Sequence, residues 1–143
     1  MGWRQRAAFY CYLLGCLPLL AFGLVYLFRA EFMPYHAIAV EQSWNEVEPA
    51  FQVLVLALMR VAGGGWVATA TAIALLLFIP YRQGQGWTRW AIPAVGLPAS
   101  LASLYATVSV TLNTPASPPW QAAALGVGLL AIGFLLSVVV SKK

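Results

Sequence analysis

The chain has 143 residues, of which 62% are hydrophobic, 13% aromatic and only 8% charged. Soluble domains carry charge on roughly a quarter of their residues, so the composition excludes a water-soluble globular fold. The net charge is +4, but the basic residues are scattered in ones and twos and form no stripe that tracks phosphates, so nucleic-acid binding is not expected. The composition indicates an integral membrane protein surrounded by the lipid bilayer.

Four apolar segments are long enough to cross a membrane, which takes about 20 helical residues. They cover residues 7–28, 53–79, 90–112 and 121–140. We expect the first segment to remain as an uncleaved span, because it is longer than the core of a secretory signal. The short connectors 80–89 and 113–120 make neighbouring helices antiparallel, whereas the first connector, 29–52, is longer. The sequence therefore predicts one all-α domain over residues 1–143, a four-helix transmembrane bundle with a cap at 29–52.

The distribution of Lys and Arg predicts the orientation, because these residues concentrate in cytoplasmic loops. Six basic residues fall on one side of a four-pass topology: Arg4, Arg6, Arg82, Arg89, Lys142 and Lys143. Only Arg29 falls at a span end on the other side, and all four glutamates lie in the connector 29–52. We therefore expect a multi-pass membrane protein with both termini in the cytoplasm and an extracytoplasmic cap.

Repeated small residues predict the buried helix faces, because helices in lipid associate through close packing. The repeats on the second and fourth spans are Gly64, Ala68 and Ala72, then Ala124 and Gly128, and Ala122 and Gly126. The third span carries a seam of small and hydroxyl residues, Gly96, Ser100, Ser103, Thr107 and Thr111. We expect this seam to face protein, with its hydroxyls bonded to carbonyls one turn back or to a neighbouring helix. A solute pathway is the alternative.

Arg60 is the one charge inside an apolar run. A rise of 1.5 Å per residue places it about 28 Å from Ile79, near the outer interface. If the helix begins at Pro49, with Glu48 at its cap, about 16 Å of apolar helix continues past Arg60. The connector residues 29–48 are therefore predicted to fold back and shelter this extension.

Three roles are open for Arg60. In the first, it forms an ion pair with one of the connector glutamates, Glu41, Glu46 or Glu48. In the second, its side chain reaches the lipid headgroups. The third role is an anchor for an anion or another ligand. In that case the candidate ligand pocket is lined by Tyr35, His36, Glu41, Arg60 and Trp66.

The sequence does not predict a metal site, a cofactor or catalysis. His36 is the only histidine, and a lone imidazole at an interface is usually a hydrogen-bonded side chain. Cys11 and Cys16 lie about 140° apart around a helix and are not expected to pair, and the chain has no Cys-x-x-Cys motif. No complete catalytic set is present, so we do not expect an enzyme.

Two stretches of the chain carry a resemblance to a known family. Residues 23–34 read Gly-Leu-Val-Tyr-Leu-Phe-Arg-Ala-Glu-Phe-Met-Pro, and residues 58–66 read Leu-Met-Arg-Val-Ala-Gly-Gly-Gly-Trp. Together with their surroundings, which make up about half the chain, they resemble the small bacterial DoxX-like four-helix membrane proteins. The resemblance implies a four-helix bundle, and some members of the group are associated with membrane redox complexes that use quinone. By position it singles out Arg60, Gly63 and Gly64.

Three functions are compatible with these features. The first is a non-enzymatic accessory or structural subunit of a membrane complex, for example a redox complex. Such a subunit packs on a membrane protein partner or on a second copy of the chain. The second is a binding module for a quinone, lipid or other small amphiphile at the outer leaflet. The third is a small dimeric transporter, although proton-coupled transport needs an ionisable group within the spans, and every glutamate lies outside them.

Overall fold

A computed structural model describes residues 2–139, which fold into five α-helices and contain no strand. The helices are α1 (Trp3–Phe28), α2 (Pro34–Val40), α3 (Pro49–Leu76), α4 (Thr88–Asn113) and α5 (Trp120–Val139). A short 3₁₀ turn, Trp44–Glu46, follows α2, and a π-helical segment, Leu77–Tyr81, continues α3. Four helices are long and apolar enough to cross a membrane. The predicted all-α, multi-pass bundle is confirmed.

Helix α3 is longer than the predicted span 53–79. It begins at Pro49 with Glu48 at its cap, as the sequence predicted. With the π-helical segment it reaches Tyr81, a total of 33 residues. Pro80 lies in that segment, and because proline has no backbone N–H, it interrupts the regular α-helical bonding at this point. The other three spans agree with prediction to within a few residues.

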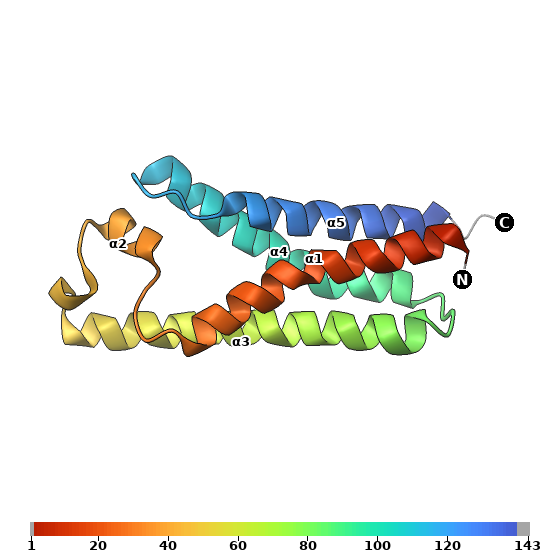
Figure 1. Ribbon diagram of the computed structural model, residues 1–143, viewed down its shortest axis with the longest axis horizontal. Coiled ribbons are helices and arrows are strands. Elements are labelled where there is room, and N and C mark those ends of the chain that lie inside the picture. Colours follow the sequence, from red (N-terminus) through yellow and green to blue (C-terminus); the bar gives the residue numbers. More distant parts are fainter. Residues whose placement is uncertain (1, 140–143) are drawn as a thin grey trace.

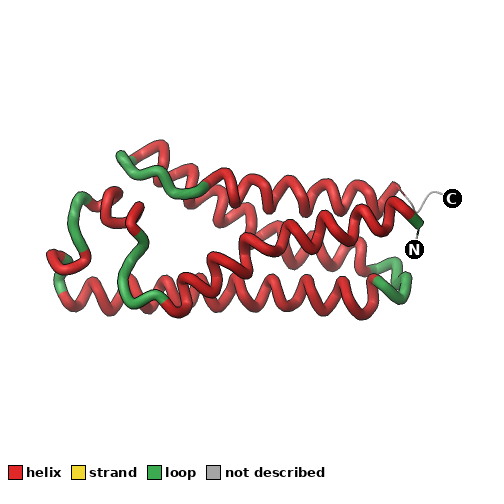
Figure 2. The backbone as a smooth tube through the Cα atoms, viewed as in Figure 1, coloured by secondary structure: helices red, strands yellow, loops and turns green. Residues whose placement is uncertain are grey.

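The four long helices form a bundle, and the distance between α3 and α4 changes along its length. Helix α1 packs along both α3 and α5, and α4 packs on α5 and less extensively on α3. Figure 1 shows α4 starting beside the end of α3 and rising toward the start of α5, so that α3 and α4 diverge. The short helix α2 lies at the open end, where Figure 2 shows most of the loop residues. We call this the cap end and the opposite end the terminal end.

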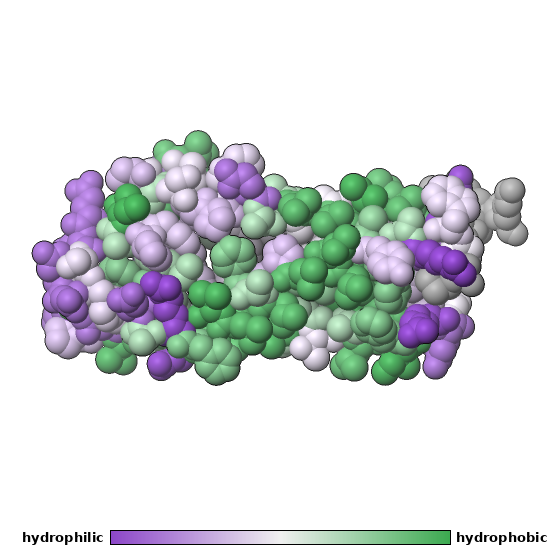
Figure 3. Space-filling model, in the orientation of Figure 1, coloured by the Kyte–Doolittle hydropathy of each residue, from purple (hydrophilic) through white to green (hydrophobic). Residues whose placement is uncertain are grey.

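The surface polarity is typical of a membrane protein. Hydrophobic residues cover the middle of the visible face, and hydrophilic residues gather at its two ends (Figure 3). Arg82 is exposed at the terminal end, and Glu41, Glu46 and Glu48 are exposed at the cap end. Lys142 and Lys143 lie outside the described residues. A band of apolar surface between two polar ends is what a bilayer requires.

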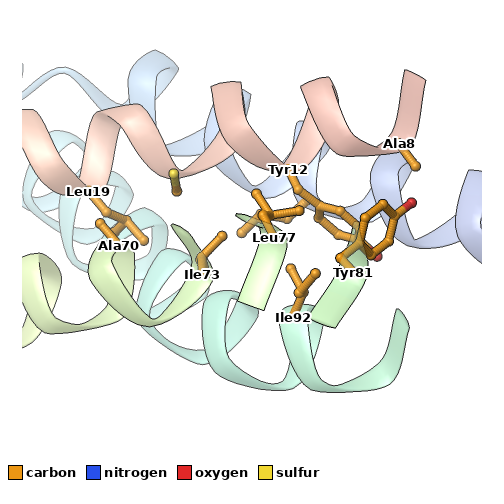
Figure 4. Close-up of a cluster of buried hydrophobic side chains, with 10 residues drawn as sticks. Ala8, Tyr12, Leu19, Ala70, Ile73, Leu77, Tyr81 and Ile92 are labelled. Atoms are coloured by element: carbon orange, nitrogen blue, oxygen red, sulfur yellow. The ribbon is translucent and has the colours of Figure 1, made fainter. Parts of the chain in front are cut away.

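A tightly packed core occupies the terminal end (Figure 4). It contains Ala8, Tyr12, Cys16, Leu19, Ala70, Ile73, Leu77, Tyr81, Ile92 and Leu130. The Tyr81 hydroxyl lies 3.2 Å from both the Gln5 carbonyl and the Ser137 hydroxyl, which ties together the ends of three helices. Cys11 and Cys16 are both free thiols.

Helices α1 and α3 cross where two glycines meet. A Cβ atom on Gly63 would lie 2.7 Å from the Gly23 carbonyl oxygen and 2.9 Å from the Leu27 nitrogen. The buried side of α3 comprises Met59, Gly63, Ala70 and Ile73. The predicted stripe Gly64, Ala68 and Ala72 is therefore wrong, since Ala68 is exposed and a Cβ on Gly64 would meet nothing closer than 3.9 Å. Adjacent helical residues point about 100° apart, and the crossing uses the glycine one position earlier.

The small residues of the last two spans agree better with the predicted buried faces. Gly126 is buried against the Gly15 carbonyl, whereas a Cβ on Gly128 would meet nothing within 4 Å. On α4, the hydroxyls of Ser103, Thr107 and Thr111 donate to carbonyls one turn back. The Ser100 hydroxyl is buried without a partner among the described residues. The bonding of these hydroxyls one turn back is as expected; Gly96 and Ser100 are buried, whereas Ser103 and Thr107 border a cavity.

Candidate functional site

A cavity of about 130 Å³ lies between the long helices near the cap end. It is lined by Pro18, Leu19, Phe22 and Tyr26 of α1, Tyr35 and His36 of α2, Trp66 of α3, Ser103, Ala106, Thr107 and Val110 of α4, and Pro118, Pro119 and Ala123 at the start of α5. Most of this lining is apolar. Its polar side chains are Ser103 and Thr107 of α4, Tyr35 and His36 of α2, Tyr26 of α1 and Trp66 of α3.

The cavity exists because small side chains face a widening space. Helix α4 separates from α3 toward the cap end (Figure 1), and the α4 residues that face the cavity include Ser103, Ala106 and Thr107. These side chains are too short to fill the gap that the diverging helices leave. Tyr35 and His36 of helix α2 line the cap side of this partly open space.

Helix α2 is capped at both ends. Pro34 occupies the first helical position, where its missing N–H is not needed. The Met33 backbone N–H donates to His36 Nδ1 at 3.3 Å, so the histidine side chain caps its own helix. At the other end Glu41 adopts a left-handed conformation with φ 55°, a common way to end a helix.

The residues around α2 attach it to the bundle. Phe32 is buried, with its ring 4.9 Å from the ring of Trp44. The Gln52 side chain of α3 donates to the Trp44 carbonyl at 2.7 Å. Glu46 accepts bonds from the Ser43 backbone and hydroxyl, both at 2.8 Å, which close the 3₁₀ turn and lower the pKa of the Glu46 carboxyl. Residues 29–48 are thus a folded segment.

A hydrogen-bonded chain of three side chains forms the cap side of the cavity. The Tyr26 hydroxyl lies 2.7 Å from the Tyr35 hydroxyl and 3.3 Å from His36 Nε2. The Tyr26 ring also packs edge-on against Trp66, with centroids 4.8 Å apart. These contacts join α1, α2 and α3 at one point, beside an apolar space.

The environment keeps this chain uncharged near neutral pH. Burial lowers the pKa of His36, and the nearby Arg29 cation lowers it further. Burial and the hydrogen bond with Tyr26 raise the pKa of Tyr35. The site therefore presents a neutral imidazole and protonated phenols, which suits a neutral ligand better than an ionised one.

A second hollow, the outer cleft, lies between α2, the 3₁₀ turn and the start of α3. It measures about 590 Å³ and is lined by Phe32, His36, Ala39, Val40, Gln42, Glu46, Val47, Glu48, Phe51 and Val55. Half of these side chains are exposed. Although the outer cleft is larger, the inner cavity is the better candidate site, because ligand pockets bury their ligand around a few convergent polar groups.

The structure brings together only part of the predicted pocket. Tyr35, His36 and Trp66 line the cavity, but Arg60 and Glu41 do not. Arg60 is exposed and lies about 120° around α3 from Trp66, so it faces a different direction. Glu41 is exposed at the end of α2, where it caps the helix.

The predicted ion pair of Arg60 with a connector glutamate is wrong for the described residues, in which Arg29 and Glu31 form the one salt bridge, at 3.0 Å. The predicted shelter for the α3 extension is also incomplete. Phe51 and Val53 remain 58% and 72% exposed, because the outer cleft separates α2 from the start of α3.

Sequence reasoning missed Tyr26, Phe22 and Pro118. Tyr26 lies near the end of the first predicted span, and the sequence does not show that its side chain points inward. Pro118 belongs to the short connector 113–120, yet its side chain is among the most completely buried. Neither feature has a periodic signal that could reveal it.

Comparisons of the chain with protein-family models, with curated proteins and with solved structures give no match. The DoxX-like resemblance therefore stays a prediction.

Proposed function

We propose that this protein binds the ring or chain end of a small neutral amphiphile, such as a quinone or a lipid, within the membrane. One observation carries the proposal: an apolar cavity of about 130 Å³ adjoins the hydrogen-bonded Tyr26–Tyr35–His36 chain. An engineered cavity of about 150 Å³ in another protein admits benzene, so the space suits one ring. The resemblance to proteins associated with quinone-using complexes agrees with this choice.

The proposed placement is a bacterial inner membrane, with both termini in the cytoplasm. Arg4, Arg6, Arg82 and Arg89 support it, because they cluster at the terminal end and basic residues favour the cytoplasmic side. The cap would then be extracytoplasmic, and the ligand would reach the cavity from the outer leaflet.

A role as an accessory subunit is the second candidate, and helix α3 favours it. Its 33 residues extend for about 50 Å, whereas the hydrocarbon core is about 30 Å thick. Past Arg60 the helix exposes Phe51, Val53 and Leu58. A membrane protein partner or a second copy of the chain would cover this apolar surface.

Isolation in mild detergent, with mass analysis of what remains bound, tests both candidates. Ala123→Leu should fill the cavity, and Ala102→Leu is the matched control, because Ala102 is exposed on α4 and lies outside the cavity. We expect the wild-type protein and Ala102→Leu to retain the same amphiphile and Ala123→Leu to lose it while still folding. An equal yield of that compound from Ala123→Leu would contradict the binding proposal. A stoichiometric protein partner without an amphiphile would favour the subunit.

A further inference from the structure

The tautomer of His36 follows from its two neighbours. A backbone N–H is always a donor, so the bond from Met33 requires Nδ1 to be unprotonated. The neutral ring then carries its proton on Nε2, which donates to the Tyr26 oxygen at 3.3 Å. Both ring nitrogens have a partner in this orientation, whereas a flipped ring would present two carbons in their place.

The Tyr26–Tyr35–His36 chain has one proton more than it can use. Its donors are the Nε2–H of His36 and the hydroxyls of Tyr26 and Tyr35, which makes three protons. Only two hydrogen bonds join the three groups. Because the imidazole proton is used, the spare proton belongs to a tyrosine hydroxyl, whichever tyrosine donates to the other. Both tyrosines line the cavity.

The other polar side chains of the cavity do not take up this proton in the described structure. Within residues 2–139, no hydrogen bond joins Tyr26 or Tyr35 to Ser103 or Thr107, whose hydroxyls are bonded to carbonyls of α4. Trp66 adds an indole N–H, which is a donor only. The tyrosine pair is partly buried beside an apolar space, where a donor without an acceptor is unfavourable, so a group that accepts a hydrogen bond would complete the site.

We propose that the cavity selects ligands with a neutral carbonyl oxygen, such as a quinone or an aryl ketone, and that this oxygen accepts the spare hydroxyl proton of the tyrosine pair. This inference rests on the proposed function and narrows its ligand class. A plain hydrocarbon fills the same space but leaves the proton unpaired. Protonated His36 is not required, since the donor is a phenol.

Two probes of nearly identical shape test the selectivity. Acetophenone carries a carbonyl where α-methylstyrene carries a CH₂ group. Binding of each to the full chain in lipid nanodiscs is measured by equilibrium dialysis and corrected with empty nanodiscs. One additional hydrogen bond should favour acetophenone by about fivefold or more, and its ¹³C carbonyl resonance should move downfield on binding.

Tyr26→Phe would free the Nε2–H of His36, which also lines the cavity, so the test is made in a His36→Leu background. There the double variant Tyr26→Phe/Tyr35→Phe removes the remaining donors of the chain, and we expect it to lose the preference while still binding α-methylstyrene. Removal of one hydroxyl is insufficient, because the other then carries the spare proton. The matched control is Tyr10→Phe/Tyr105→Phe, since these tyrosines are 60% and 77% exposed and lie outside the cavity. This control should keep the wild-type preference.

The outcomes separate the two proposals. If the wild-type protein binds neither probe, the proposed function fails together with this inference. If it binds both probes equally, or if the preference and the carbonyl shift persist in the double variant, only the inference is overturned. Should the double variant fail to fold, the wild-type preference and the carbonyl resonance still decide the question, because equal binding without a shift contradicts the inference.

Discussion

The two ends of the bundle use the same long helices in different ways. At the terminal end, side chains from α1, α3, α4 and α5 meet in a closed core, and Tyr12, Ile73 and Leu130 are completely buried. At the cap end, α3 and α4 separate and leave the cavity, which a seven-residue helix closes. Packing stabilises the first end, whereas the second has space for a ligand.

This difference separates the source of stability from the site of binding. Core side chains at the terminal end hold the helices together without the cap. The cap is attached through a few contacts, chiefly Tyr26 with Tyr35 and Gln52 with the Trp44 carbonyl. Regions with few buried contacts open at low cost in free energy, so α2 is able to move while the remaining bundle stays folded.

The largest effect is expected at the α1–α3 crossing. Gly63→Ala should destabilise the protein by about 3 kcal/mol, the upper end of the range for overpacking, because the new methyl group meets backbone atoms of α1 that cannot yield. Gly65→Ala is the control, since a Cβ at Gly65 meets nothing within 4 Å and alanine favours helix. Thermal unfolding in detergent should show opposite changes in Tm. Equal changes would show that the crossing is not tightly packed.

A smaller effect is expected from truncating one buried side chain at the terminal end. Leu130→Ala should destabilise by about 2 kcal/mol, near the low end for such substitutions, because in lipid mainly the packing contribution is lost. Val110→Ala at the cavity wall should cost less than about 1 kcal/mol, since Val110 already borders empty space. Denaturant unfolding compares the two variants. A larger loss for Val110→Ala would contradict the contrast between the ends.

The long helices were more predictable from sequence than the cavity between them. Hydrophobic length revealed all four spans, and Pro49 correctly marked the start of α3. The small-residue pattern found Gly126 but chose Gly64 instead of Gly63, because a run of three glycines does not show which one meets the neighbouring helix.

The cavity was only partly predictable. Tyr35, His36 and Trp66 were correctly grouped, since a connector that folds back must place its aromatic residues near the adjoining helix ends. Arg60 attracted attention as an isolated charge, yet its direction depends on helix phase, and nothing in the sequence fixes that phase relative to α2. The divergence of α3 and α4, which creates the cavity, is a property of the packed bundle and has no local sequence signal.

The smallest predicted effect is a loosening of the cap at low pH. Burial and Arg29 lower the pKa of His36 below the value of about 6.5 in an unfolded chain. The folded state therefore favours the neutral ring, so this stabilisation is present above about pH 6.5 and is lost as the pH falls through the folded-state pKa.

Protonation places a hydrogen on Nδ1, which then opposes the Met33 N–H. His36 is only partly buried and shares the outer cleft with the carboxylates of Glu46 and Glu48, so we expect a change of less than about 1 kcal/mol. Hydrogen exchange, corrected for intrinsic rates, should show faster opening of residues 34–40 at pH 5 than at pH 7.5, with residues 8–19 unchanged. His36→Gln keeps an acceptor for Met33 and should abolish the difference. If residues 8–19 open equally, the two ends do not behave independently, and the separation of stability from binding is wrong.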